Sequence, residues 1–195
     1  MGKIIEGHAI DLISDVGALD LVVTDPPYAF GGSGPEHELS ATVAVVLREC
    51  ANRLARGAWM CVFSASSWRA INYVVEATRG IVSPVRIATW AKPVAKTKVR
   101  TVGWDWASVA LVALRKGPKN RKELAAGSGY IDHIAQRPIT RGRRAQLPQD
   151  VAEWAVAPFV VRGGLFLDPF AGSGALVDAA ESMGMDASGF EIQPG

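Results

Sequence analysis

The sequence has little cysteine and little histidine. Only two of its 195 residues are cysteines, Cys50 and Cys61, and both lie within apolar stretches. No disulfide framework is expected, and we predict that both are buried small hydrophobic residues of a protein from a reducing compartment. The three histidines, at positions 8, 37 and 133, have no metal-ligand spacing, so no metal site is expected.

Long apolar segments and strong compositional bias are also lacking. The longest clean apolar run, residues 106–114, contains a serine and is far shorter than the roughly 20 residues that a membrane helix needs. The first residues lack the basic and apolar regions of a signal peptide. With 49% hydrophobic and 21% charged residues, the composition excludes disordered and collagen-like classes. We therefore expect a cytoplasmic, non-membrane protein with a single domain over residues 1–195.

Acidic side chains are scarce in the middle of the chain. Between Arg86 and Arg144 there are 14 Lys and Arg residues against 3 Asp and Glu residues, a local charge of +11. The remainder carries −9, which leaves a net charge of +2. A basic middle on an acidic frame suits the binding of a polyanion such as a nucleic acid. A set of solvated basic loops is the alternative that charge alone leaves open.

Apolar runs and helical spacings alternate along the chain. Strands are predicted at residues 3–6, 19–24, 58–63, 85–90, 107–114, 165–167 and 187–190, and the main helices at residues 39–54, 68–78, 149–160 and 175–183. The run LDLVVT is apolar almost throughout, as in a strand buried on both faces of a parallel sheet. The alternation predicts an α/β fold with a doubly wound, mostly parallel sheet. Residues 117–146 are expected to form loop or a small irregular insert.

The first candidate functional segment is Asp25-Pro26-Pro27-Tyr28, directly after the LDLVVT run. Neither proline has a backbone N–H, so the turn presents carbonyl oxygens and one carboxylate, all of them hydrogen-bond acceptors. Ligands of open α/β sheets bind at the carboxyl ends of the strands. The segment therefore suits a substrate that donates hydrogen bonds, such as an exocyclic amino group, with the tyrosine ring available for stacking. A rigid exit from the strand is the structural alternative.

The second candidate segment is the glycine-rich turn Asp-Pro-Phe-Ala-Gly-Ser-Gly at residues 168–174. Its glycines allow a ligand to approach the backbone closely. Val177 takes the third glycine position of a dinucleotide fingerprint, and no Lys followed by Ser or Thr completes a P-loop, so phosphate binding is disfavoured. A nucleoside-type ligand without a phosphate fits better. Glu191, after the next strand, stands where a carboxylate binds ribose hydroxyls in dinucleotide folds, an exposed strand-end charge being the alternative.

Together the two segments resemble the catalytic and S-adenosylmethionine motifs of the amino-methyltransferases that act on DNA bases. The catalytic motif comes first, a basic segment follows and the cofactor motif comes last, which is the order of the circularly permuted beta-type members. The resemblance covers nearly the whole chain, including the Ile-Ile-Glu-Gly stretch at residues 4–7. It implies a Rossmann-like, seven-stranded sheet with a parallel centre and an antiparallel pair. Where the family has Asp after this early glycine, the chain has His8.

The resemblance also implies residue roles. The catalytic residues would be Asp25, Pro26, Pro27 and Tyr28. The cofactor would be bound by Asp168, Phe170, Ala171, Gly172, Ser173, Gly174, Glu191 and His8, although His8 could instead face the base or be a surface residue. DNA phosphates would be bound by Lys92, Lys96, Lys98, Arg100, Arg141, Arg143 and Arg144, in a short basic recognition insert at about residues 92–105 and 116–146.

The implied activity is methyl transfer from S-adenosylmethionine to the N6 amino group of adenine in DNA, after the base has been flipped out of the duplex. Asp25 favours adenine, because aspartate leads the catalytic motif more often in the family's adenine-directed members. Methylation of cytosine N4 and a non-catalytic DNA-binding relative are the alternatives. The expected partner is DNA, in a bacterial or phage-infected cell and a restriction–modification setting. A homodimer would enlarge the small recognition surface.

Overall fold

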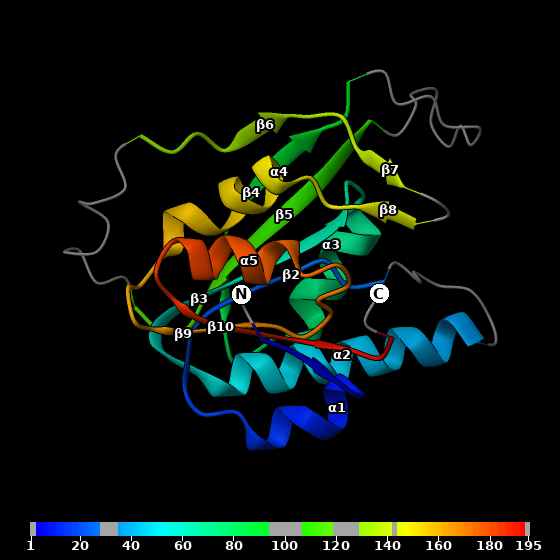
Figure 1. Cartoon of the computed structure of the whole chain (residues 1–195). Helices are drawn as coiled ribbons and strands as arrows, with labels where there is room; N and C mark the ends of the chain where they lie inside the picture. The colour runs from blue at the N-terminus through cyan, green and yellow to red at the C-terminus, as the bar shows by residue number, and fades with distance from the viewer. Residues whose placement is uncertain (1–2, 28–34, 94–106, 119–128, 142–143, 194–195) are drawn as a thin grey trace.

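A mixed eight-stranded sheet runs through the protein in the order β1-β10-β9-β2-β3-β5-β4-β6 (Figure 1). The structure is a computed structural model that describes residues 3–27, 35–93, 107–118, 129–141 and 144–193. The strands of this sheet are β1 (Lys3–Glu6), β2 (Leu19–Thr24), β3 (Leu54–Ala65), β4 (Ser83–Ala91), β5 (Ser108–Arg115), β6 (His133–Ala135), β9 (Leu165–Asp168) and β10 (Asp186–Glu191). A separate antiparallel pair consists of β7 (Ile139–Arg141) and β8 (Arg144–Gln146).

Helices cover both faces of the large sheet. One face is covered by α1 (Ala9–Leu12), α2 (Pro35–Arg53) and α3 (Trp68–Ala77), and the other by α4 (Gln149–Val156) and α5 (Ala175–Ser182). Figure 1 shows α4 and α5 next to each other, with α1 and α2 on the opposite side of the sheet. This confirms the doubly wound α/β architecture predicted from the alternation of strands and helices. In the described part of the chain, no helix is long and apolar enough to cross a membrane.

The pairing of the strands divides the sheet into a parallel part and an antiparallel part. β1, β10, β9, β2 and β3 are parallel, whereas β5 runs antiparallel to both β3 and β4. The sheet has one strand more than the seven implied by the resemblance, because β6 adds to the edge parallel to β4. β6, β7 and β8 all lie in the segment expected to be irregular. Each of these strands has only three residues, too few to show the alternation of apolar and polar residues that predicts a strand. They are strands because their backbones pair with neighbouring strands.

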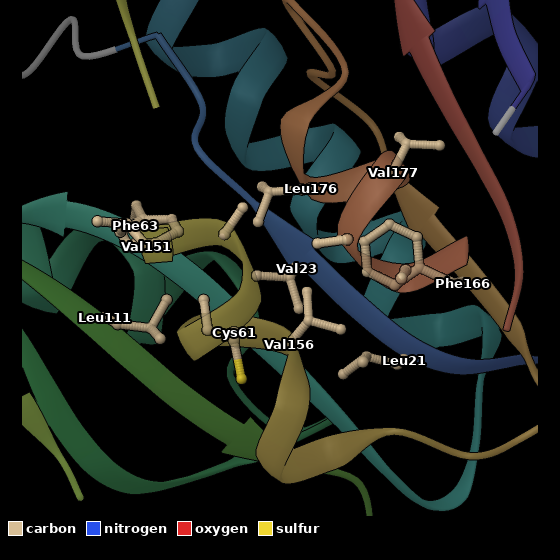
Figure 2. Packing of buried hydrophobic residues seen from close by; sticks show 14 of the residues in the cluster. Leu21, Val23, Cys61, Phe63, Leu111, Val151, Val156, Phe166, Leu176 and Val177 are labelled. Atoms are coloured by element: carbon tan, nitrogen blue, oxygen red, sulfur yellow. The ribbon is translucent and has the colours of Figure 1, made fainter. Parts of the chain in front are cut away.

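The core explains why β2 is apolar throughout. Leu21 and Val23 point into the cluster under α4 and α5, whereas Val22 points into the cluster under α1, α2 and α3, and all three are fully buried. Figure 2 shows Leu21 and Val23 close to Phe166 of β9, with side chains of α4 and α5 around them. A strand covered on both faces needs apolar side chains on both, so it loses the alternating pattern.

Both cysteines belong to this core. Cys50 of α2 and Cys61 of β3 are fully buried free thiols, which confirms the prediction that they act as small hydrophobic residues. Burial raises the pKa of both thiols, so they stay protonated and unreactive.

Gly189 of β10 lies where strand and turn approach each other most closely. A Cβ atom at this position would lie 2.6 Å from Cβ of Ala171 and 2.8 Å from Cγ2 of Val177. Such distances are shorter than van der Waals contact, so a side chain here displaces the turn at residues 168–174 or the start of α5. The absence of a side chain at Gly189 thus allows the turn at residues 168–174 to pack directly against β10.

We expect Gly189→Ala to lower the free energy of unfolding by about 1–3 kcal/mol, as for other overpacked sites. Gly17→Ala is the matched control, because its Cβ would meet only Cδ1 of Leu165, at 3.8 Å. Urea denaturation of the two variants and the wild type measures the difference. Equal stabilities of the two variants would contradict the close approach.

Candidate functional site

Both predicted segments start at the same edge of the sheet. β2 and β9 are parallel neighbours, with Val22 opposite Leu167, so Asp25 and Asp168 come at adjacent strand ends. The chain leaves β2 toward α2 on one face and leaves β9 toward α5 on the other. Crossovers that part to opposite faces open a crevice at the carboxyl ends of the strands, which is where ligands bind in open α/β sheets.

The acceptor turn follows β2. Asp25 is half-buried, Pro26 is buried and Pro27 is exposed, while Tyr28 lies outside the described residues. Asp25 lines the pocket described below, whereas Pro26 and Pro27 are not part of that lining and have no backbone N–H to donate.

The glycine turn follows β9 and leads into α5. Gly174, with a φ of +86°, is the N-cap of the helix and donates its N–H to the carbonyl of Ala171 at 2.8 Å. Ala171 in turn donates to the carbonyl of Phe190 at 2.9 Å, which holds the turn against β10. Gly172 and Ser173 are exposed, and a Cβ atom on Gly172 would meet nothing within 4 Å. The top of the turn is therefore open to a ligand.

A short hydrogen bond joins the two strand ends. The hydroxyl Oγ1 of Thr24 donates to Oδ1 of Asp168 at 2.6 Å, and both side chains are buried. The same oxygen accepts the backbone N–H of Phe170 at 3.0 Å. Burial raises the pKa of Asp168 from 3.8 to about 7, against these two hydrogen bonds, which lower it. The nearby carboxyl groups of Asp25 and Glu191 raise it further.

Glu191, at the end of β10, supports the glycine turn. Its Oε2 accepts the backbone N–H of Gly172 at 2.9 Å, and its Oε1 accepts that of Gln193 at 3.1 Å. His8 is exposed and precedes α1 without a capping hydrogen bond from its side chain. The neighbouring Gly7 donates its N–H to the carbonyl of Glu191 at 3.0 Å. Neither Glu191 nor His8 belongs to the lining of the pocket between the two turns.

The acceptor turn and the glycine turn share one pocket of about 240 Å³. It is lined by Asp25, Gln146, Leu147, Asp168, Phe170, Ala171, Gly172, Ser173, Ala175, Leu176 and Gln193. Among the residues that the structure describes, this lining contains two carboxyl groups and no Lys or Arg. Such a pocket suits a ligand that carries positive charge and donates hydrogen bonds, and it disfavours a phosphate.

Lys92, predicted to bind a DNA phosphate, follows β4 and is half-buried. Its Nζ lies 4.5 Å from the centroid of the Trp90 ring, within range of a cation–π interaction. Trp90 is anchored by its Nε1, which donates to the carbonyl of Gln136 at 2.8 Å. Burial lowers the pKa of Lys92 and the charge of Asp25 raises it, so the ammonium group lies within electrostatic range of the acceptor turn. Lys92 is thus close to the pocket.

The other predicted DNA contacts are described only in part. Lys96, Lys98, Arg100 and Arg143 lie outside the described residues. The backbones of Arg141 and Arg144 face each other in the β7–β8 ladder. Gln146, at the end of β8, lines the pocket, so this basic hairpin starts beside the two turns.

Six residues of the site were not predicted, and two of them, Ala175 and Leu176, directly follow the glycine turn in α5. Thr24 directly precedes the acceptor turn, and its hydroxyl at the end of an apolar strand is a signal that could have been noticed. Gln146, Leu147 and Gln193 line the pocket from segments with no motif, so no local pattern identifies them.

A larger groove, of about 710 Å³, lies at the opposite end of the strands. It is bordered by Asp20 near the start of β2, Arg115 at the end of the antiparallel β5, and Trp154 of α4. The groove includes neither predicted segment and lies at the amino ends of the parallel strands. The smaller pocket at the carboxyl ends is therefore the candidate functional site. Among the residues that the structure describes, no three His, Cys, Asp or Glu side chains are grouped to hold a metal ion.

Comparison with known proteins bears on the fold. No protein-family model matches the chain, and a comparison with curated proteins gives no match. Among solved structures, TTHA0409 from Thermus thermophilus, named as a DNA modification methylase and solved with S-adenosyl-L-methionine, is 21% identical, with a TM-score of 0.73 over 100% of this chain and 89% of that one.

Two further structures give similar agreement. The M1.HpyAVI–SAM complex is 19% identical, with a TM-score of 0.74 over 99% of this chain and 94% of that chain. PvuII DNA methyltransferase, named as cytosine-N4-specific, is 18% identical, with a TM-score of 0.72 over 99% and 82%. The chain has the Rossmann-like fold of these methyltransferases from end to end.

The buried carboxyl group gives a prediction for the pH dependence of stability. Because the pKa of Asp168 is raised from 3.8 to about 7 on folding, the folded state holds this proton more tightly than the unfolded state. Its stabilising contribution is therefore present at low pH and is lost as the pH rises toward 7. We expect Asp168→Asn, which does not titrate, to gain stability relative to the wild type as the pH increases from about 4 to about 7.

Urea denaturation of the ligand-free proteins over this pH range measures the effect. Asp186→Asn is the control, because Asp186 is exposed at the amino end of β10. Stability curves of Asp168→Asn and the wild type that stay parallel would show that Asp168 does not titrate in this way.

Proposed function

We propose that this protein transfers a methyl group from S-adenosylmethionine to an exocyclic amino group of a base in DNA, with N6 of adenine as the favoured target. The observation that carries the proposal is the pocket in which the acceptor turn, with Asp25, meets the glycine turn, with Asp168 and Gly172. Methyl transfer to an amine requires these two surfaces together, one for the amino group and one for the methyl donor. The shared fold with DNA methyltransferases supports the proposal.

The residues of the glycine turn fit the proposed cofactor. The Asp168 carboxyl group is suited to an ammonium group, and the exposed backbone at Gly172 and Ser173 leaves space for the methionine part. Each carboxylate oxygen of Glu191 accepts one hydrogen bond within the described part of the chain and has two lone pairs, so it could also accept hydrogen bonds from ribose hydroxyls while it supports the turn. When bound, S-adenosylmethionine supplies an electrophilic methyl group on a positively charged sulfur.

The acceptor turn has the chemistry to activate an amino group. The lone pair of an adenine or cytosine amino nitrogen is delocalised into the ring, which makes the nitrogen a weak nucleophile. The Asp25 carboxylate and the Pro26 carbonyl would accept its two hydrogens and draw the group toward a tetrahedral shape. The same oxygens then stabilise the positive charge that develops on nitrogen as it gains the methyl group, by a few kcal/mol for a preorganised contact. The surplus proton leaves to water.

DNA would approach from the side of the basic hairpin. Arg141 and Arg144 lie in β7 and β8, whose end contributes Gln146 to the pocket. Their charge would neutralise backbone phosphates outside the pocket, while the acidic pocket would exclude the phosphates and admit the uncharged base. A base inside a duplex is out of reach, so it would be flipped out, and the predicted stacking on Tyr28 would replace its lost neighbours. The basic recognition insert at residues 92–105 and 116–146 belongs to the proposal on the same grounds.

The choice between adenine and cytosine rests on the leading residue of the catalytic motif. Asp25 favours adenine by resemblance, whereas the acceptor turn suits either amino group. The decisive experiment incubates the protein with DNA and S-adenosylmethionine labelled in the methyl group, digests the DNA to nucleosides and identifies the labelled base. N6-methyladenine is expected. Label on cytosine N4 would establish the alternative, and absence of label with intact cofactor binding would favour a non-catalytic DNA-binding protein.

Removal of the central acceptor should separate catalysis from cofactor binding. We expect Asp25→Ala to lower the rate of methyl transfer by about 100-fold or more, because a preorganised group that stabilises charge in the transition state is lost. Its affinity for S-adenosylmethionine, measured by calorimetry, should stay within a few-fold of that of the wild type. Asp186→Ala at the opposite edge of the sheet is the control. Near wild-type turnover of Asp25→Ala would end this mechanism.

A further inference from the structure

We infer that Thr24 is a positioning residue: its hydroxyl holds one oxygen of Asp168 against the glycine turn and leaves the other oxygen for a cationic group of the ligand. Thr24 belongs to the strand of the acceptor turn, and Asp168 ends the strand of the glycine turn, 144 residues away in sequence. The inference rests on the proposed function in one respect, namely that the ligand of the glycine turn is S-adenosylmethionine with its ammonium group.

The geometry of the carboxyl group carries this inference. Oδ1 of Asp168 accepts two hydrogen bonds, from Oγ1 of Thr24 at 2.6 Å and from the backbone N–H of Phe170 at 3.0 Å. Asp168 also lines the pocket, so a ligand that binds this carboxyl group would do so through Oδ2, the oxygen that these two donors do not hold. Two donors on one oxygen fix the rotation of the carboxyl group. Thr24 and Asp168 are only 0% and 1% exposed, so their hydrogen bond is shielded from bulk water.

The hydroxyl also acts on the charge of the carboxyl group. Burial raises the pKa of Asp168 to about 7, and the hydrogen bond from Thr24 is the largest interaction that lowers it. The other titratable groups around it are Asp25 after β2, Glu191 at the end of β10 and Cys50 of α2. The two carboxylates raise the pKa of Asp168, and the buried thiol of Cys50 stays uncharged. Without Thr24, nothing from these groups would favour the ionised form.

A functional consequence follows for the pH range of binding. A cationic ammonium group binds the ionised carboxyl group better than the protonated one, so ionisation of Asp168 should raise the affinity as the pH approaches about 7. Loss of a hydrogen bond to a charged acceptor typically moves a pKa by one unit or more, about tenfold in binding near neutral pH. Thr24 therefore extends binding of the ligand down to neutral pH.

The test compares the wild type with Thr24→Val, which removes the donor at nearly equal volume, and Thr24→Ser, which keeps it. Calorimetric binding of S-adenosylmethionine is measured from about pH 5 to about pH 9. We expect Thr24→Val to bind about tenfold more weakly near neutral pH and to recover at high pH, and Thr24→Ser to follow the wild type. Equal weakening of Thr24→Val at all pH values, or a valine-like profile of the serine variant, would overturn the inference.

A second measurement keeps this result separate from the proposed function. Carbon-13 NMR of the ligand-free proteins follows the titration of the Asp168 carboxyl group, assigned with Asp168→Asn. The midpoint should lie higher in Thr24→Val than in the wild type and the serine variant, and an unchanged midpoint overturns the inference. If the wild type bound no S-adenosylmethionine at any pH while the midpoint still shifted, the proposed function would fail and the role of Thr24 at Asp168 would stand. Thermal denaturation confirms that each variant is folded.

Discussion

The adjacency of β2 and β9 is the constraint on which the rest of the site depends. These strands lie far apart in the sequence, yet they pair in parallel at the centre of the sheet, and their crossovers part to opposite faces. The buried hydrogen bond from Thr24 to Asp168 joins their ends. Because of this pairing, a turn of acceptors and a turn of glycines open onto the same pocket. Any other strand order would leave two unrelated loops.

Acidic and basic side chains occupy different parts of the molecule. Asp25 and Asp168 line the pocket, with Glu191 close behind, so the interior of the site is negative. Carboxylates that lie close together in a poorly solvated region destabilise one another. Hydrogen bonds from the glycine turn stabilise the carboxylates of Asp168 and Glu191, and the raised pKa of Asp168 favours its neutral form. Basic residues gather in the middle of the chain, including the β7–β8 hairpin beside the pocket. The pocket therefore suits a cationic ligand, whereas the basic residues outside the pocket suit a polyanion.

Much of the fold could be predicted because local hydrophobic patterns in the sequence indicate most of its strands and helices. The run at 19–24 is apolar on both faces, and the structure buries it on both faces. Strands were expected at residues 85–90 and 107–114, and β4 and β5 form there and pair antiparallel. The short strands β6, β7 and β8 were missed, because three residues carry no measurable period and their pairing comes from the backbone of distant residues. Helix α2 also begins earlier than the periodicity indicates, at Pro35.

The sequence by itself determined which residues are chemically equipped: acceptors at Asp25 and Pro26, close-approach glycines at 172 and 174, and a basic middle. Composition and local spacing suffice for this, because hydrogen-bonding capacity and backbone freedom are properties of individual residues. Only the tertiary structure decided that Thr24 bonds Asp168, that Gln146 lines the pocket and that Lys92 lies within electrostatic range of Asp25. These contacts join residues far apart in sequence, and they depend on strand order, register and burial, which no local pattern encodes.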